Sequence, residues 1–172
     1  MSDIRIEIAT LSDAPAVTTL FERSYSRLLV GEYDAKTLDR AMAFLAHANP
    51  DLLGSGTYYL ARTADGALAG SGGWTMNRPG TKDDISPGVA HVRHFAVDPD
   101  HTRKGIARAL FDRCVADAKQ INGVHQFECY STLSAQRFYE KLGFEVIGEF
   151  AAPFAPDFSF PSLHMRCDLT RN

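Results

Sequence analysis

The stretch from residue 89 to residue 130 constrains the fold most, because it predicts a strand, a long amphipathic helix and a second strand in that order. Val89–Val97 is the first strand, which Asp98-Pro99-Asp100 stops, since proline cannot donate to a ladder. Gly105–Ile121 is the helix and Gln126–Tyr130 the second strand. The helix carries one apolar stripe, made by Ile106, Leu110, Cys114 and Ala118. Strands joined by a helix are parallel neighbours, so we expect one parallel step in a sheet.

The other apolar patterns predict the remaining elements. Strands are expected at 4–8, 58–62, 67–74, 144–150 and 163–169, and helices after Ser12-Asp13, from Asp34 to Asn49-Pro50, and at 134–142. Residues 77–88 and the aromatic segment 150–160 are expected to be loops. This order predicts an α/β (α+β) fold, a mixed, mostly antiparallel central sheet of about seven strands with helices on both faces. We expect a single domain over residues 1–172.

The composition argues against several classes of protein. Of the 172 residues, 45% are apolar and 23% are charged, which is typical of a globular chain. Lys and Arg number 18 against 21 Asp and Glu, so we expect no nucleic-acid partner. No apolar run approaches the ~18–20 residues of a membrane span, and we expect no membrane partner. The N-terminal residues lack a secretory signal pattern, which favours a cytoplasmic protein.

The cysteine content also favours a cytoplasmic protein. Cys114, Cys129 and Cys167 are an odd number without CxxC spacing, so we expect neither a disulfide framework nor a zinc site. A reducing cytoplasm fits this usage. Cys114 and Cys167 are predicted to be small core residues, and we expect no metal.

The loop before the long helix has the character of an anion site. Gly105 and Ala107 leave little bulk at the helix start, where backbone N–H groups and the helix dipole favour a phosphate. Arg103, Lys104 and Arg108 add positive charge. The pattern is neither a P-loop nor a dinucleotide GxGxxG motif. An ordinary strand–helix turn with a solvated basic edge is the alternative interpretation.

Two motifs in this order resemble the GNAT acetyltransferase superfamily. Residues 102–107, TRKGIA, resemble the family signature Gln/Arg-x-x-Gly-x-Gly/Ala, with Thr102 departing at the first position. Residues 135–144, AQRFYEKLGF, resemble the family's later helix and turn. Thr132 stands where the family often has Asn. The opening strand and helix, from Ile4 to Leu20, also resemble the family, so the resemblance covers nearly the whole chain.

This resemblance implies that acetyl-CoA is the cosubstrate and lies between the strands ending at Val97 and Tyr130, which would part there. Backbone groups of Phe95 and Val97 would bind the pantetheine like an added strand, and the loop 103–108 would hold the pyrophosphate. An N–H near Phe95 would polarise the thioester carbonyl. The expected cofactor-binding residues are Phe95, Ala96, Val97, Arg103, Lys104, Gly105, Ile106, Ala107, Arg108, Thr132 and Phe138.

The catalytic residues are predicted with alternatives left open. Tyr139 is the candidate acid for the departing thiolate, or it packs on the apolar stripe of its helix. His91 is the candidate base for the attacking amine, at a strand position where the family often has an acidic residue, or it is a hydrogen-bonded structural residue. Strand parity places His94 on the opposite face from His91, which argues against a metal pair.

Three further features have competing interpretations. Glu128 could orient a base or a water, but is expected to pair with an Arg or a Lys. Cys129 lies near the expected thiol exit, yet no His–Asp arrangement would activate it as a nucleophile. The aromatic segment 150–160 could line the acceptor pocket, pack on residues 77–88 or form a homodimer contact. The family geometry implies an opposite wall made by Tyr25, Leu28 and Leu29.

The sequence therefore predicts an acetyl-CoA-dependent N-acetyltransferase that moves the acetyl group directly to a primary amine of a small-molecule, peptide or protein acceptor. A non-catalytic acyl-CoA-binding regulatory module on the same fold is the alternative function. A binder of another nucleotide through the same anion site is a third.

Overall fold

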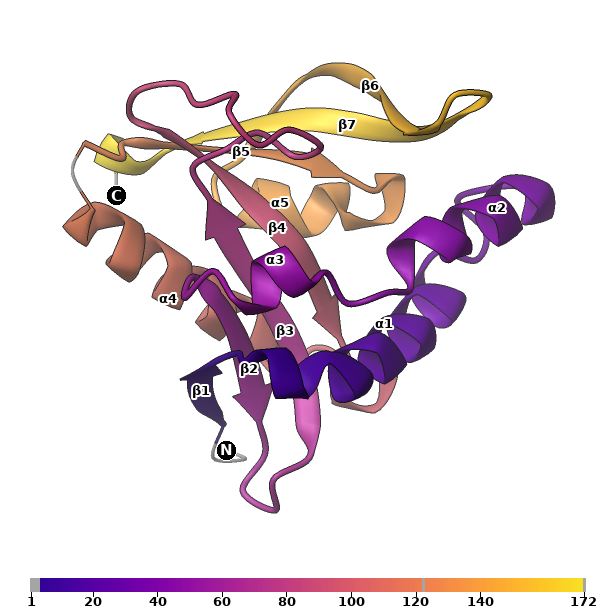
Figure 1. Cartoon of the computed structure of the whole chain (residues 1–172), viewed down its shortest axis with the longest axis horizontal. Coiled ribbons are helices and arrows are strands. Elements are labelled where there is room, and N and C mark those ends of the chain that lie inside the picture. Colours follow the sequence, from indigo (N-terminus) through magenta and orange to yellow (C-terminus); the bar gives the residue numbers. More distant parts are fainter. Residues whose placement is uncertain (1–3, 122, 172) are drawn as a thin grey trace.

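A seven-stranded sheet organises the molecule, which we describe from a computed structural model over residues 4–121 and 123–171 (Figure 1). The strand order is β1-β2-β3-β4-β5-β7-β6. Neighbours are antiparallel except β4 and β5, which are parallel and joined by a helix. The strands are β1 (Arg5–Ile8), β2 (Tyr58–Arg62), β3 (Leu68–Thr75), β4 (Val89–Val97), β5 (Gln126–Ser131), β6 (Glu145–Ala155) and β7 (Phe158–Asp168). The predicted sheet and its parallel step are confirmed.

Helices cover both faces of the sheet. The front face, toward the viewer in Figure 1, carries α1 (Ala14–Leu28), α2 (Ala35–Leu45) and α3 (Pro50–Leu53). The back face carries α4 (Ile106–Gln120) and α5 (Gln136–Lys141). Short 3-10 helices span Leu11–Asp13, Pro99–His101, Leu133–Ala135 and Leu169–Arg171. Within the described ranges, none of the helices combines the length and apolar character that crossing a bilayer requires.

Each face buries its own apolar cluster. On the back, Ile106 and Leu110 of α4 pack with Trp74 and Phe127 of the sheet. On the front, Phe21 of α1 packs among a second set of buried residues, which includes Tyr25, Leu53, Tyr58 and Leu60. Since successive strand residues point to opposite faces, cluster membership shows which side chains reach the front.

The predicted end of the second helix is wrong. The second helix ends at Leu45, and Asn49-Pro50 begins the short helix α3 instead of ending α2. The Asn49 side chain accepts a hydrogen bond from the N–H of Asp51 at 2.9 Å, so it acts as an N-cap with proline at the first helical position.

The aromatic segment 150–160 is not a loop, because β6 and β7 form one long hairpin that includes it. Proline suggested loop structure, but prolines are tolerated where a strand has a free edge. Pro153 lies on β6, which is the edge strand of the sheet. Pro161 lies on β7 beyond Leu163, the last residue that pairs with β5, so β7 has an open side there.

The two parallel strands stay together for only three residue pairs. Val89, Ala90 and His91 of β4 pair with Gln126, Phe127 and Glu128 of β5, and no later residue of either strand is paired with the other. Each strand continues beyond that point, β4 to Val97 and β5 to Ser131. The strands therefore part in the middle of the sheet, and the functional site is built around this parting.

Candidate active site

The loop that enters α4 has an unusual backbone. Arg103 and Gly105 both have positive φ, at 59° and 78°. No side chain caps the helix, and the N–H of Ala109 makes its hydrogen bond to the Gly105 carbonyl at 2.9 Å. The N–H groups of Ile106, Ala107 and Arg108 therefore precede the first helical bond. Left-handed residues before a helix start form a concave set of N–H groups that suits an anion.

Space and charge around this loop fit a diphosphate. A Cβ built on Gly105 would meet nothing within 4 Å, so the loop opens outward at this point. Arg103, Lys104 and Arg108 are exposed. Lys104 donates to the Asp100 carbonyl at 3.1 Å, and Arg108 pairs with Asp112 at 2.9 Å.

Thr102, which departs from the family signature, has a local role. Its hydroxyl donates to the Pro99 carbonyl at 3.2 Å. The hydroxyl thus closes its own turn, and the backbone N–H groups at the helix start are left as the candidate anion donors.

The exposed edge of β4 runs from the parting to this loop. The N–H of Asp98 bonds to Ala69 of β3 at 2.9 Å, so alternation directs the N–H and C=O of Val97 toward β5, where no partner strand is paired. The Phe95 carbonyl accepts the Tyr25 hydroxyl at 3.4 Å. Gly72 makes room for the Phe95 ring, because a Cβ there would lie 2.6 Å from it.

Helix α5 brings the predicted acid to the back of the parting. Tyr139 is 7% exposed, and its ring lies 5.1 Å from that of Phe138 and 5.2 Å from that of Phe144. Burial raises the pKa of Tyr139 well above 10, with smaller contributions from Cys129 and from Tyr25. Tyr139 belongs to the apolar cluster of the back face, as does Cys129. Its hydroxyl keeps its proton at all ordinary pH values.

Thr132 precedes the 3-10 turn that leads into α5, and Tyr33 holds this turn in place. The Tyr33 hydroxyl accepts from the N–H of Leu133 at 2.9 Å and donates to the carbonyl of Pro161 at 2.9 Å. One side chain between α1 and α2 thus ties β5, α5 and β7 together. Sequence reasoning missed Tyr33, because a lone loop tyrosine carries no signal.

His91 lies at the front of the parting. It is 5% exposed, it is aligned with Thr75 on β3 and Glu128 on β5, and its Nδ1 has no hydrogen-bond partner among the described residues. Burial lowers the pKa of His91 below its ordinary value of 6.5. The imidazole is therefore neutral near pH 7 and can accept a proton.

The parity prediction for His94 is wrong. Ser71 faces Ala96 and Gly73 faces Arg93, so β4 has one residue more than β3 over this stretch, and His94 has φ of 52°. This β-bulge turns the His94 ring to the front, where it stacks on Phe21 with centroids 4.1 Å apart. Its Nε2 lies 3.0 Å from the Leu45 carbonyl, and burial lowers its pKa to about 4.

Glu128 pairs as predicted, and it has a second partner that sequence reasoning missed. Arg166 donates to its Oε1 at 3.1 Å, and His164 Nε2 lies 2.8 Å from Oε2. Burial alone would raise the pKa of Glu128, but these two contacts hold it below its ordinary value. His164 could not be found from sequence because its place opposite Tyr130 depends on the β5–β7 register.

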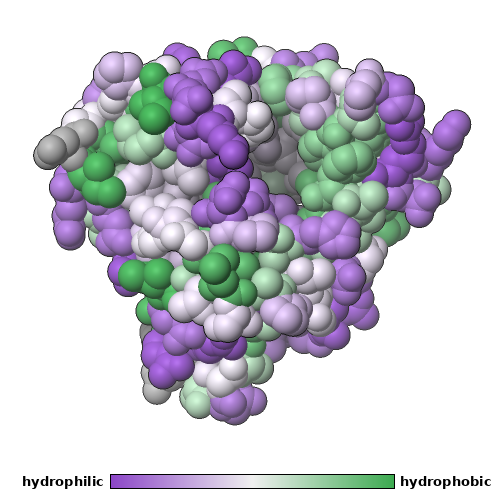
Figure 2. Space-filling model, viewed as in Figure 1, coloured by the Kyte–Doolittle hydropathy of each residue, from purple (hydrophilic) through white to green (hydrophobic). Residues whose placement is uncertain are grey.

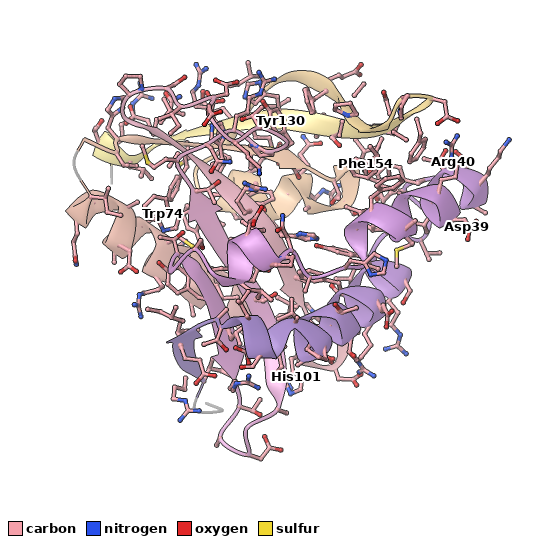
Figure 3. The ribbon with its side chains drawn as sticks, viewed as in Figure 1. Asp39, Arg40, Trp74, His101, Tyr130 and Phe154 are labelled. Carbon is pink, nitrogen blue, oxygen red and sulfur yellow. The ribbon has the colours of Figure 1, made fainter. Side chains whose placement is uncertain are left out.

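The front face is hollowed between α2 and the loop that precedes β4 (Figure 2). Figure 3 shows Phe154 of the β6–β7 hairpin and Arg40 of α2 close together on the α2 side of this hollow. The Phe154 ring lies 5.3 Å from Phe44, and the ring of Phe160 lies 4.4 Å from Tyr33. The aromatic segment thus packs on α2 and its preceding loop. On the other side, Arg78 donates to the Tyr130 hydroxyl at 2.8 Å.

The cysteines offer no nucleophile. Cys129 is 2% exposed, and burial raises its pKa far above the ordinary value of 9. All three cysteines are buried and unbridged. Among residues 4–121 and 123–171, no group of three His, Cys, Asp or Glu side chains could hold a metal ion.

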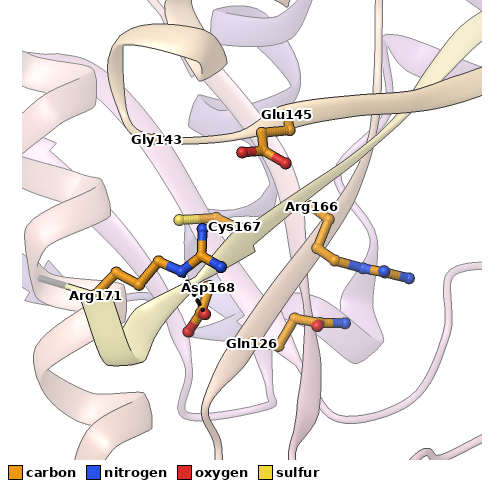
Figure 4. A pocket seen from close by; sticks show the side chains of 7 residues that line it. All are labelled: Gln126, Gly143, Glu145, Arg166, Cys167, Asp168 and Arg171. Carbon is orange, nitrogen blue, oxygen red and sulfur yellow. Dashed lines mark ion pairs between the residues drawn. The ribbon is translucent and has the colours of Figure 1, made fainter.

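A separate polar pocket lies at the other end of β5, where the strand begins (Figure 4). Arg171 pairs with Asp168 there at 3.2 Å. The lining residues are Gln126, Gly143, Glu145, Arg166, Cys167, Asp168 and Arg171. This pocket contains neither the helix start of α4 nor the parted strand ends.

Known proteins share this architecture. The family model described as the acetyltransferase (GNAT) domain matches residues 31–152. The PaiA N-acetyltransferase from Thermoplasma acidophilum, solved in complex with coenzyme A, is similar over 96% of this chain and 99% of its own, with a TM-score of 0.69 and 17% identity. A GCN5-related N-acetyltransferase from Kribbella flavida is 26% identical, with a TM-score of 0.61 over 96% of this chain and 98% of its own.

A further GCN5-related N-acetyltransferase structure, from Rhodopseudomonas palustris, has a TM-score of 0.71 and 18% identity over 98% of this chain and 96% of its own. A search of curated proteins finds no match to this sequence. The fold, the parted strands and the glycine-containing helix start define an acetyltransferase of the GNAT type. This chain belongs to the GNAT acetyltransferase family.

Proposed function

We propose that the protein is an acetyl-CoA-dependent N-acetyltransferase that moves an acetyl group from the thioester directly to a primary amine. The parting of β4 and β5 beside an uncapped, glycine-led helix start carries this proposal. An extended pantetheine fits beside the open backbone of Val97, and a diphosphate fits the N–H groups of the loop 103–108. The coenzyme A complex of the PaiA N-acetyltransferase supports the same ligand.

The reaction needs three contributions from this chain. The neutral imidazole of His91 takes a proton from the acceptor ammonium, directly or through water. The amine nitrogen then bonds to the thioester carbonyl carbon, whose oxygen accepts from a backbone N–H near Phe95. The carbon–sulfur bond breaks, and Tyr139 supplies a proton to the departing thiolate. The second proton, which the nitrogen loses as it becomes the amide nitrogen, returns to the Tyr139 oxygen, so that the net proton released is the one His91 took. No covalent enzyme intermediate is required, and buried Cys129 has no part in the proposal.

We propose that all 172 residues form one acetyltransferase domain, since the elements outside the matched range 31–152 contribute β1, α1 and β7 to the same sheet and its cover. We also propose a cytoplasmic protein. Three buried, unbridged cysteines fit a reducing compartment.

An amine panel with acetyl-CoA and thiol detection tests the proposal. We expect stoichiometric release of free coenzyme A and of an acetylated amine identified by mass spectrometry. Thermal shift with coenzyme A and with ATP accompanies the panel, because a ligand at a hundred times its dissociation constant stabilises by about 2.7 kcal/mol. Stabilisation by coenzyme A without thiol release from any amine would support the regulatory module. Stabilisation by ATP alone would support a different nucleotide.

A further inference from the structure

Arg93 is a half-buried cation on the front face without an acidic partner. Its guanidinium donates from Nη1 to the Thr75 hydroxyl at 2.8 Å, and no carboxylate within residues 4–121 and 123–171 forms an ion pair with it. The other half-buried arginines each bind an acid: Arg40 binds Asp157, Arg62 binds Glu7 and Asp13, and Arg113 binds Asp117. Arg93 is thus the exception in the described chain.

An unpaired guanidinium in this position is costly. Burial lowers the pKa of Arg93, but a guanidinium stays charged at any pH at which proteins fold. A desolvated charge needs an opposite charge or several hydrogen bonds. One neutral hydroxyl leaves most of the five N–H donors of Arg93 available to a ligand.

The position of Arg93 places it at the acceptor end of the site. Alternation puts Arg93 on the same face as His91, two residues earlier on β4. From Arg93, β4 continues away from His91 through Phe95 to Val97 and the anion loop, where the cosubstrate is proposed to lie. An amine that reaches the thioester from the front would therefore pass Arg93.

The charges around Arg93 also favour an anion. Among the described residues, the ionisable groups that interact with Arg93 are Tyr58, His91 and His94, and none of them is a carboxylate. The next acids are Asp84 and Glu128, which act on His91 together with Arg78. Asp84 lies 3.6 Å from Arg78, and Glu128 is bound by Arg166 and His164. Both acids are thus occupied, and Arg93 remains as uncompensated positive charge.

We propose that Arg93 binds a carboxylate of the acceptor, so that the substrate is an amine that carries a carboxylate, as an amino acid does. This assignment rests on the acetyltransferase function proposed above. The planar fork of a guanidinium matches a carboxylate with two parallel hydrogen bonds. The carboxylate anchors the acceptor at Arg93, and its amine is left to face His91 and the thioester.

Matched pairs of amines test this assignment. Each pair is an amino acid and the amine that its decarboxylation gives, assayed at saturating acetyl-CoA by thiol release. We expect kcat/KM to favour the amino acid, and Arg93→Gln to lower that value about ten- to hundredfold, mainly through KM, without slowing the decarboxylated amine. An equal or better rate on the decarboxylated partner, or an unchanged ratio in Arg93→Gln, would overturn the assignment.

Two further variants and a binding measurement keep the test decisive. Arg93→Lys keeps the charge without the fork and should retain part of the preference. Arg5→Gln removes an exposed arginine of β1 and should leave the ratio unchanged. Calorimetry of an N-acetyl amino acid against the matched N-acetyl amine, with coenzyme A present, needs no turnover.

The binding measurement also separates the two proposals. Stronger binding of the N-acetyl amino acid, lost in Arg93→Gln, supports the carboxylate site even where no amine releases thiol and the acetyltransferase function fails. Equal binding of both N-acetyl compounds overturns the carboxylate site even where amines are acetylated. Should Arg93→Gln fail to fold, the Arg93→Lys variant is measured in its place, and an unchanged ratio in that folded variant counts against a bidentate carboxylate contact.

Discussion

His91 and Glu128 are the last two residues held side by side before β4 and β5 part. The two side chains lie on the front face in different states. Glu128 is ionised and bound by Arg166 and His164, whereas the buried Nδ1 of His91 has no hydrogen-bond partner among the described residues. A strand pair that ends at this imidazole gives the candidate site both its space and its proposed proton acceptor.

Replacement of His91 should change the pH dependence of the rate. Because burial lowers the pKa of His91, the imidazole is neutral at pH 7, and the rate should fall as pH drops through this lowered pKa. His91→Gln should lose that acid limb and about a hundredfold in kcat. A pH–rate series of both proteins measures this, and an acid limb that survives in His91→Gln rules out His91 as the base.

Replacement of Tyr139 should separate chemistry from binding. Tyr139→Phe keeps the ring contacts with Phe138 and Phe144 but removes the proton donor, so kcat should fall about a hundredfold. Affinity for coenzyme A should stay nearly the same. Because burial raises the pKa of Tyr139 well above 10, its ionisation should not limit the rate below that pH. Full turnover of the variant at saturating acceptor would remove Tyr139 from the mechanism.

Cys129 should be dispensable for turnover. Its buried thiol stays protonated because burial raises its pKa, and thiols are poor nucleophiles. Cys129→Ala should keep most of its rate and lose about 1 kcal/mol of stability from the small cavity. Mass spectrometry of the enzyme mixed with acetyl-CoA should show no acetylated protein. An acetylated Cys129, together with an inactive alanine variant, would establish a covalent route instead.

His94 should make the folded state sensitive to acid. Its pKa is about 4 in the fold, against an ordinary 6.5, so the unfolded chain binds a proton that the folded chain refuses between these values. The contribution of His94 to the free energy of unfolding, about 3 kcal/mol, is therefore fully present above pH 6.5 and is lost as the pH falls toward 4. Denaturant titrations at several pH values measure the slope.

The matched variant for this effect is His94→Asn, because asparagine tolerates positive φ and does not titrate. It should be less stable at pH 7, where it lacks the stacking on Phe21, and should show a shallower loss between pH 6.5 and 4. Parallel pH dependences of the two proteins would mean that other groups, such as Glu128, dominate the acid sensitivity.

The sequence predicted the elements whose patterns are strong and local. Val89–Val97 is a strand with the predicted bounds, and α4 begins and ends within one residue of the predicted helix. The parallel step follows from the helix between two strands. The long β6–β7 hairpin was not predictable from local pattern, because Pro153 and Pro161 are tolerated only through the strand edges that the whole sheet provides.

Parts of the site depend on relations that no local pattern contains. The His94 bulge arises from the pairing of β4 with β3, and it reverses the face that simple alternation predicts. His164 meets Glu128 only through the β5–β7 register, and Tyr33 meets Leu133 across 100 residues of chain. The motif residues at 103–108 were visible in the sequence because the proposed anion site is a local backbone shape.

The central claim is that a diphosphate sits on the N–H groups that Gly105 leads, and calorimetric titration of coenzyme A tests it most directly. Gly105→Ala and Gly105→Glu both force a side chain at φ of 78° and share that backbone cost, of about 1–2 kcal/mol. Only the glutamate puts a negative charge into the open space in front of the loop. We predict that the alanine variant binds within about tenfold of the parent, whereas the glutamate variant binds at least about a hundredfold more weakly. Equal affinities of the two variants would contradict the claim.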